Sequence, residues 1–225
     1  MKTIVKRRPF GKNGIDVSEV SFGAMNLRML KDLTLSRNLV NSILDQGVNC
    51  IDTARAYNSD AGSVPMIESE VILGEVISAR TDIDEPLLII TKCHGYTPED
   101  VSGYFQESMQ RLRIRQENGK LYIGQTEIKL CYLLHGINED RWKSIKSSKV
   151  IDFAKKMQAE GKFHYLGFSS HYSDVEIIRE AIETGQFEAC ELPRNIYNAV
   201  LSEDGEQDIF KLANEHGMGI INMKA

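Results

Sequence analysis

The sequence predicts an α/β protein built as a (β/α)8 TIM barrel, incomplete at about seven βα units, behind an N-terminal hairpin. Short apolar segments of strand type alternate with amphipathic segments of helix type, a pattern typical of a parallel sheet covered by helices. Polar or charged side chains follow nearly every strand, as they do at the carboxyl end of barrel strands. The first strand leads into Gly23-Ala24-Met25-Asn26, which lacks the glycine spacing of a phosphate loop and argues against a doubly wound sheet.

The elements follow in order from these patterns. Residues 4–20 predict a hairpin with an Asn13-Gly14 turn signal, and Thr34 and Gly47 mark the start and stop of the first helix. The expected strands cover residues 21–25, 48–53, 87–92, 130–134, 165–168, 187–192 and 219–223. The expected helices cover residues 35–46, 68–79, 98–113, 149–160, a segment from Ser173, Asp174 and Glu176 to Gly185, and residues 206–216. Residues 114–129 predict a polar insertion in the form of a small hairpin.

The strand count does not close a barrel. A full barrel needs eight strands and about 250 residues, whereas these 225 residues end just after the seventh strand. We therefore expect a single barrel domain over residues 1–225 that lacks the eighth strand and the C-terminal segment. Unpaired edges on the first and seventh strands would favour self-association.

Composition excludes several classes of protein. A formal net charge of -5 argues against general nucleic-acid binding, which needs a basic face. No apolar run reaches the length of a membrane span, and no signal core follows the basic N-terminus. The four cysteines show no CxxC pairing and lie in or beside apolar strands, which predicts buried, reduced thiols and therefore a reducing cytoplasm as the location.

Four side chains at successive strand ends suggest proton transfer. Asp52 ends the second strand and Tyr57 follows five residues later, while Lys92 ends the third strand and His135 ends the fourth. A lysine near a phenol favours the phenolate and lowers the phenol's pKa from its reference of about 10. An aspartate beside the lysine keeps it charged, and a histidine can hydrogen-bond a carbonyl oxygen. Such a group would polarise a carbonyl and protonate the alkoxide that forms on reduction.

The chain resembles the aldo-keto reductase family over essentially its whole length. The matching stretches are Val20-Ser21-Phe22-Gly23, Asn49-Cys50-Ile51-Asp52-Thr53-Ala54 with Tyr57, Ser69-Glu70 with Leu73-Gly74, Ile90-Thr91-Lys92, Leu133-Leu134-His135 and Leu166-Gly167-Phe168-Ser169. The resemblance implies NADPH-dependent reduction of a small aldehyde or ketone. It places the family's catalytic tetrad on Asp52, Tyr57, Lys92 and His135, with Tyr57 as the general acid.

The resemblance also implies where the cofactor binds. Family members hold the nicotinamide carboxamide with Ser-Asn after the fifth strand and Gln on the sixth. This chain has Ser169-Ser170 and Glu191 at those positions, with Asn195 close behind, and an ionised carboxylate can only accept a hydrogen bond. The family's phosphate-binding segments follow the seventh and eighth strands, and the sequence ends before them.

Two other interpretations remain open at this stage. His94, His135 and His171 with Asp52 resemble the ligand types of a zinc-dependent barrel hydrolase, although Lys92 would oppose the charge of the metal. Alternatively, the chain is a truncated, non-catalytic reductase-like binding protein or a gene fragment. Taken singly, His94 and His171 are interpreted as rim histidines, and Ser169 and Ser170 equally as helix-capping serines.

Overall fold

The computed structural model describes residues 5–12, 14–171, 175–195 and 208–224. Contacts divide the chain into two compact units. The first unit contains Met1–Arg8, Ile15–Lys92 and Gly103–Leu130, and the second contains Pro9–Gly14, Cys93–Ser102 and Cys131–Ala225. The single barrel domain expected from the sequence stays a prediction.

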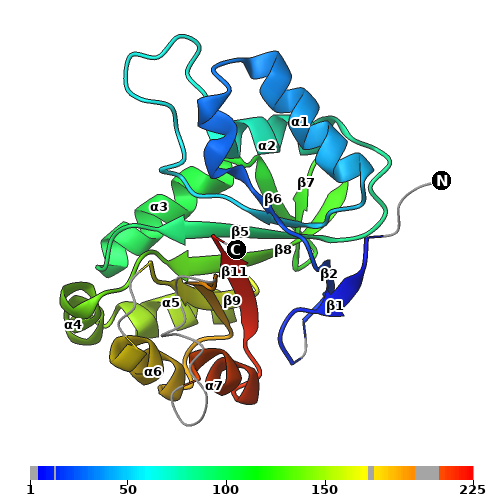
Figure 1. Cartoon of the computed structure of the whole chain (residues 1–225). Helices are drawn as coiled ribbons and strands as arrows, with labels where there is room; N and C mark the ends of the chain where they lie inside the picture. The colour runs from blue at the N-terminus through cyan, green and yellow to red at the C-terminus, as the bar shows by residue number, and fades with distance from the viewer. Residues whose placement is uncertain (1–4, 13, 172–174, 196–207, 225) are drawn as a thin grey trace. The chain divides into compact units, whose positions relative to one another are not determined.

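The predicted N-terminal hairpin is confirmed in a shorter form. Strands β1 (Arg7–Pro9) and β2 (Asp16–Ser18) form a two-stranded sheet (Figure 1). The backbone N–H of Glu19 donates to the carbonyl of Lys6 and closes the open end of the hairpin. Asn13 of the predicted turn lies outside the described residues.

Three parallel strands form the centre of the first unit. They are β3 (Phe22–Gly23), β4 (Cys50–Asp52) and β5 (Leu87–Cys93), and Ile51 pairs with Phe22 on one side and Ile89 on the other. The predicted strand over residues 21–25 is too long, because a 3-10 helix, η1 (Ala24–Met29), begins at Ala24. Its buried residues Ala24 and Leu27 are three apart, which suits the 3-10 period rather than strand alternation.

Two helices of the first unit have the predicted spans to within two residues, α1 (Leu33–Asp45) and α2 (Ser69–Ala79). The predicted N-cap Thr34 is wrong, because the Asp32 carboxylate accepts the backbone N–H of Leu35 at 2.8 Å. A carboxylate at this position satisfies an orphan N–H and also faces the positive end of the helix dipole. Gly47 follows the helix with φ +81°, as its predicted role as a stop requires.

The polar insertion is the predicted small hairpin. After α3 (Pro98–Arg111), strands β6 (Ile114–Glu117) and β7 (Lys120–Ile123) pair antiparallel across an Asn118-Gly119 turn. Strand β8 (Thr126–Leu134) begins four residues earlier than predicted. The reason is that its first residues pair antiparallel with β7, with Ile128 opposite Leu121.

The second unit contains the remaining parallel strands. Residues 131–134 of β8 pair with β9 (Tyr165–Ser169), β9 pairs with β10 (Ala189–Pro193), and β10 pairs with β11 (Gly219–Met223), all in parallel. The helices are α4 (Glu139–Ser147), α5 (Val150–Ala159), α6 (Val175–Glu183) and α7 (Ile209–Glu215). Helix α4 was not predicted, and the predicted start of α6 at Ser173-Asp174 lies outside the described residues. The alternation of parallel strands and helices predicted for the chain is confirmed.

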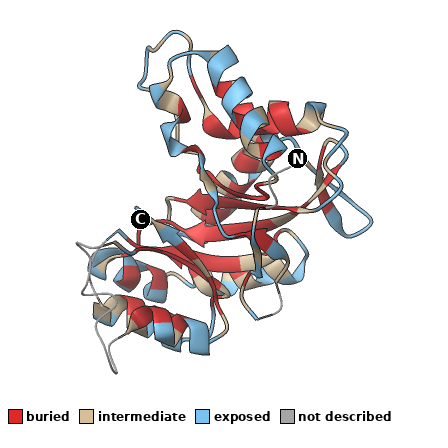
Figure 2. Ribbon diagram, turned by 45° about the vertical axis from the view of Figure 1, so that its right-hand side comes forward, coloured by how far each residue is buried: buried red, intermediate tan, exposed pale blue. Residues whose placement is uncertain are grey.

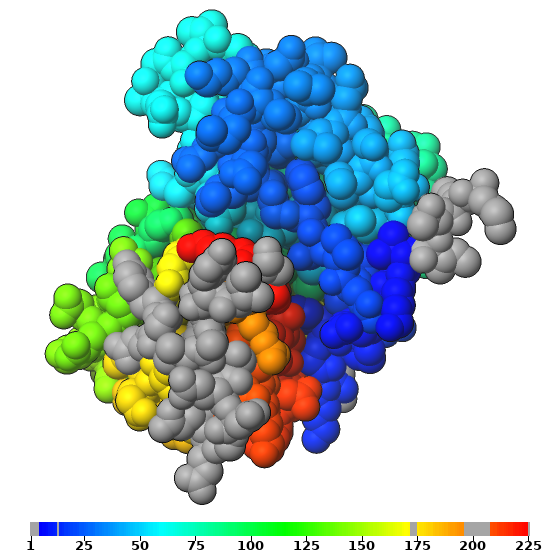
Figure 3. Space-filling view, in the orientation of Figure 1, coloured from blue at the N-terminus to red at the C-terminus, as the bar shows by residue number. Residues whose placement is uncertain are grey.

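Burial follows this architecture within each unit. Strands β4, β5, β9 and β10 are almost wholly buried, whereas β1 and β6 and the outer faces of the helices are largely exposed (Figure 2). In the space-filling view, η1 and α1 form an outer surface of the first unit (Figure 3). All four cysteines are buried free thiols, as predicted. Among the described residues, no helix combines the length and the apolar character that crossing a bilayer requires.

Candidate active site

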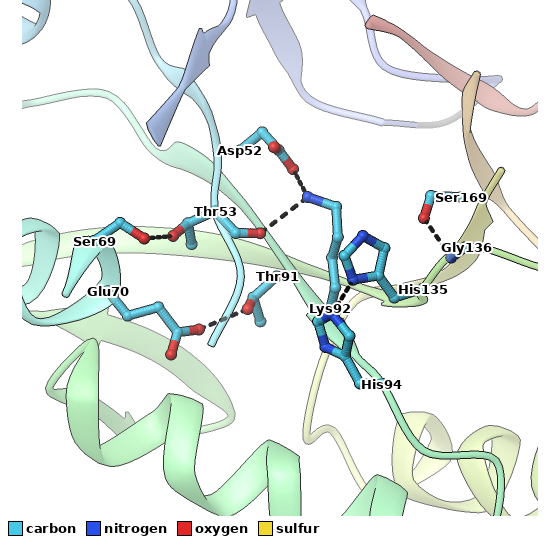
Figure 4. A network of polar contacts seen from close by, with 10 residues as sticks. All are labelled: Asp52, Thr53, Ser69, Glu70, Thr91, Lys92, His94, His135, Gly136 and Ser169. Carbon is cyan, nitrogen blue, oxygen red and sulfur yellow. Dashed lines mark hydrogen bonds and ion pairs between the residues drawn. The ribbon is translucent and has the colours of Figure 1, made fainter. Parts of the chain in front are cut away.

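The first unit brings an acid and a lysine together at two neighbouring strand ends. Asp52 is the last residue of β4, and Lys92 lies near the end of β5. Lys92 Nζ forms an ion pair with Asp52 Oδ1 and donates to the carbonyl oxygen of Thr53 at 3.0 Å (Figure 4). Because β4 and β5 are parallel, with Asp52 opposite Ile90, their carboxyl ends deliver both side chains to one place.

This ion pair is withdrawn from water. The side chain of Lys92 is 1% exposed and that of Asp52 is 10% exposed. A buried ammonium is tolerated only with a charged partner and further hydrogen bonds, and here the carboxylate and the Thr53 carbonyl supply them. The geometry therefore fixes a positive charge at a defined point, as electrostatic catalysis requires.

Tyr57 lies close to this lysine. The Lys92 ammonium lies 4.9 Å from the centroid of the Tyr57 ring. Tyr57 is half-buried and sits on a turn in which its N–H donates to the carbonyl of Ala54. A phenol beside a fixed cation has the components of a proton donor, so the structure brings three of the predicted catalytic residues together in one unit.

The first turn of helix α2 forms hydrogen bonds to residues next to Asp52 and Lys92. Its first residue, Ser69, shares a hydrogen bond of 2.9 Å with the Thr53 hydroxyl, and its second, Glu70, accepts one of 2.6 Å from the Thr91 hydroxyl. Burial raises the pKa of the Glu70 carboxyl, while the bond from Thr91 opposes that rise. The sequence matched Ser69-Glu70 only as a family stretch and gave these residues no role, because the contacts join segments far apart along the chain.

His135 belongs to the second unit, where it directly follows β8. Its backbone N–H donates to the Cys93 carbonyl at 2.9 Å, and its own carbonyl accepts the Tyr96 hydroxyl at 2.5 Å. Its ring atom Nδ1 lies 2.6 Å from His94 Nε2, a hydrogen bond in which one ring donates and the other accepts. His94, interpreted from the sequence as a rim histidine, is thus a direct partner of the predicted catalytic histidine.

The residues predicted to hold the cofactor also lie in the second unit. Ser169 Oγ accepts the backbone N–H of Gly136 at 2.9 Å, and Ser170 Oγ donates to the carbonyl of Ile137 at 2.9 Å. Both hydroxyls therefore hold the turn that follows His135. In the parallel register, the buried Glu191 lies beside Ser169, which groups a carboxylate with hydroxyls.

These side chains suit a carboxamide. A serine hydroxyl that accepts from a backbone N–H still has its own proton to donate, and a carboxylate accepts from an amide NH2. Asn195, the last predicted member, is half-buried, and its side-chain amide donates to the carbonyl of Lys224 at 2.8 Å. The donor and acceptor types present thus fit the nicotinamide end of NADPH.

The zinc interpretation finds no support in the arrangement of the histidines. The rings of His135 and His171 have centroids 5.9 Å apart, and His94 contacts His135 edge to face. No group of three or more histidine, cysteine, aspartate or glutamate side chains among the described residues is arranged to hold a metal ion.

Comparison with known proteins agrees with this geometry. The sequence model of the Aldo/keto reductase family matches residues 19–225. A 6-dehydroglucose reductase from Novosphingobium aromaticivorans is 37% identical over 89 residues, which are 38% of this chain and 28% of that protein. Curated relatives that match along most of this chain are longer, and the chain spans 46% to 63% of their length.

Solved structures share the fold at low sequence identity. A Pseudomonas aeruginosa protein described as an aldo-keto reductase superposes with a TM-score of 0.72 and 21% identity, covering 96% of this chain and 77% of that one. The aldo-keto reductase of Bombyx mori, solved in complex with NADP, superposes with a TM-score of 0.64 and 14% identity, covering 98% of this chain and 66% of that one.

Proposed function

Because the chain belongs to the aldo/keto reductase family, we propose that it is an NADPH-dependent oxidoreductase that reduces the carbonyl group of a small aldehyde or ketone to an alcohol. The observation that carries the proposal is the buried Lys92 ammonium, which is paired with the Asp52 carboxylate and lies 4.9 Å from the centroid of the Tyr57 ring. A fixed cation beside a phenol suits a reaction in which negative charge develops on a carbonyl oxygen.

In this proposal Tyr57 is the general acid. The carbonyl oxygen gains negative charge during reduction, and the Tyr57 hydroxyl gives it a proton. Lys92 stabilises the phenolate that remains, because the two charges are opposite and the ammonium is buried. Asp52 acts on the lysine, keeping the ammonium charged and oriented.

His135 is proposed to orient the substrate carbonyl by donating from Nε2. A neutral imidazole carries only one ring proton, so donation from Nε2 requires Nδ1 to be an acceptor. The hydrogen bond of 2.6 Å between His94 Nε2 and His135 Nδ1 supports this tautomer when His94 is the donor. His94 therefore enters the proposal as the residue that sets the protonation of His135.

NADPH, when bound, supplies the hydride. Glu191, Ser169, Ser170 and Asn195 would hold its nicotinamide carboxamide, and the hydroxyl and carboxylate groups on β9 and β10 support this assignment. An incomplete (β/α)8 barrel belongs to the same proposal and is supported by the fold shared with aldo-keto reductases. Cytoplasmic location and self-association through the outer strands, β3 and β11, also stay proposals.

Carbonyl reduction by the chain and by two tyrosine variants tests this function. Tyr57→Phe should abolish NADPH oxidation with aldehyde substrates. Tyr122→Phe, which alters a half-buried tyrosine of β7 stacked with Arg115, should keep the parent rate. Equal rates for parent and Tyr57→Phe would refute the assignment of the acid. NADPH titration by fluorescence distinguishes the proposed reductase from the alternative, a truncated and non-catalytic reductase-like protein. A working reductase must bind the cofactor, whereas a non-catalytic chain need not.

A further inference from the structure

The first two residues of helix α2 each reach one of the strands that carry the ion pair. Ser69 bonds the hydroxyl of Thr53, which follows Asp52 in sequence, and Glu70 accepts from the hydroxyl of Thr91, which precedes Lys92 (Figure 4). One helical turn therefore holds a neighbour of the carboxylate and a neighbour of the ammonium.

These contacts are well placed to control the lysine. Thr53 is held through its side chain by Ser69, while its carbonyl oxygen accepts the Lys92 ammonium at 3.0 Å. Thr91 lies on the peptide that leads into Lys92, so its position fixes where the lysine side chain starts. Ser69, Glu70, Thr53 and Thr91 are all buried, and buried polar bonds of this kind are costly to leave unmade.

Helix α2 is itself fixed in the first unit. A Cβ at Gly74 would lie 2.5 Å from the carbonyl oxygen of Arg111, so the helix backbone touches the end of α3 with no room for a side chain. Arg111 also pairs with Glu68, just before the helix, at 3.1 Å. The helix is therefore a firm support, and displacing its first turn would disturb the strands it holds.

We propose that Ser69 and Glu70 are positioning residues that hold the Lys92 ammonium against Asp52 through Thr53 and Thr91. Neither side chain touches the reacting atoms, and each acts on the lysine through a threonine. Their relevance to catalysis rests on the proposed function, whereas their hold on Lys92 is a property of the folded chain.

The test measures the lysine directly. The Lys92 ammonium gives a nitrogen-15 signal, identified by its absence in Lys92→Met, and its hydrogen exchange with water reports how firmly it is held. Glu70→Leu removes the acceptor for Thr91, and Thr91→Val removes the donor without changing the shape of the side chain. Both should speed exchange about tenfold, as expected for the loss of about one hydrogen bond. Glu70→Gln keeps an acceptor oxygen and should restore the parent rate.

The outcomes distinguish a role in positioning the Lys92 ammonium from a role in the stability of the fold alone. If Glu70→Leu and Thr91→Val melt at lower temperature but exchange the ammonium protons at the parent rate, the proposal is wrong. Should Glu70→Leu fail to fold, the isosteric Thr91→Val decides. In kinetic assays both variants should lower kcat about tenfold and leave KM nearly unchanged. If the parent reduces no carbonyl, the proposed function fails, while ammonium exchange still decides the positioning role.

Discussion

Replacing Asp52 by asparagine should destabilise the first unit strongly, because it leaves a buried ammonium without its counter-ion. The Lys92 side chain is 1% exposed, so water cannot replace the lost carboxylate. Removing one partner of a buried ion pair costs about 3–5 kcal/mol. The Thr53 carbonyl still accepts from Lys92 in the variant, which places the loss of stability at about 3 kcal/mol, the lower end of that range.

Urea unfolding of four proteins measures this cost. The parent, Asp52→Asn, Lys92→Met and the double variant form a cycle, and the midpoint at constant slope gives each free energy of unfolding. The double variant should recover much of the stability that Asp52→Asn loses, because no buried charge is then left uncompensated. Glu139→Gln is the matched control, since Glu139 pairs with Lys143 on the exposed face of α4 and its loss should not be measurable.

Two results would refute this reasoning. If Asp52→Asn changes stability no more than Glu139→Gln, the Lys92 ammonium does not depend on the carboxylate. If the double variant is as unstable as Asp52→Asn, the loss comes from packing around residue 52 and not from an uncompensated charge.

The remaining predictions concern burial and close packing. Burial raises the pKa of Glu70, so the folded parent should lose stability as pH rises from the unfolded-state pKa of about 4.3 through the higher folded value. The Glu70→Gln side chain does not titrate, so the free energy of unfolding of this variant, measured by urea titration, should rise relative to that of the parent as pH increases over that range. A difference in free energy of unfolding that stays constant with pH would contradict the argument. Gly167→Ala should lower the free energy of unfolding by about 1–3 kcal/mol, because the added Cβ would lie 2.4 Å from the Ala189 carbonyl oxygen. Gly103→Ala in α3 is the contrasting change: its Cβ would meet no atom within 4 Å, so the variant should be more stable than the parent by about 0.5–1 kcal/mol. Burial raises the pKa of Cys93 and of Cys190 to about 12, so neither thiol should react with Ellman's reagent until urea unfolds the chain, and rapid reaction of the native protein would contradict their burial.

The sequence predicted the parallel strands and the cluster around Lys92 for a common physical reason. Buried strands are nearly continuous apolar runs, and a polar residue ends such a run where the strand leaves the core. Asp52 and Lys92 both mark such ends, and parallel pairing brings the ends together. A local pattern was therefore enough to find side chains that lie together in the folded chain.

The features that the sequence did not predict are those that depend on tertiary contacts. Helix α4 buries only Trp142 and Ile145 within a strongly polar segment, so its periodicity is weak, although Asn138 caps it. The partner of His135 is 41 residues away, and nothing local distinguishes His94 from a solvated histidine. Asp32 and Thr34 are both residue types that cap helices, and the structure distinguishes them by one hydrogen bond, from the Leu35 N–H to the Asp32 carboxylate.

The support by helix α2 could not be predicted for a further reason. Serine and glutamate at the first positions of a helix are common because they satisfy the helix's own N–H groups and dipole. Here Ser69 and Glu70 bond instead to threonines of the adjoining strands. Lys92 is thus held by its own strand, by the end of β4 and, through these threonines, by α2. A charge fixed from three elements has little freedom to relax when a substrate binds, and electrostatic catalysis depends on that lack of relaxation.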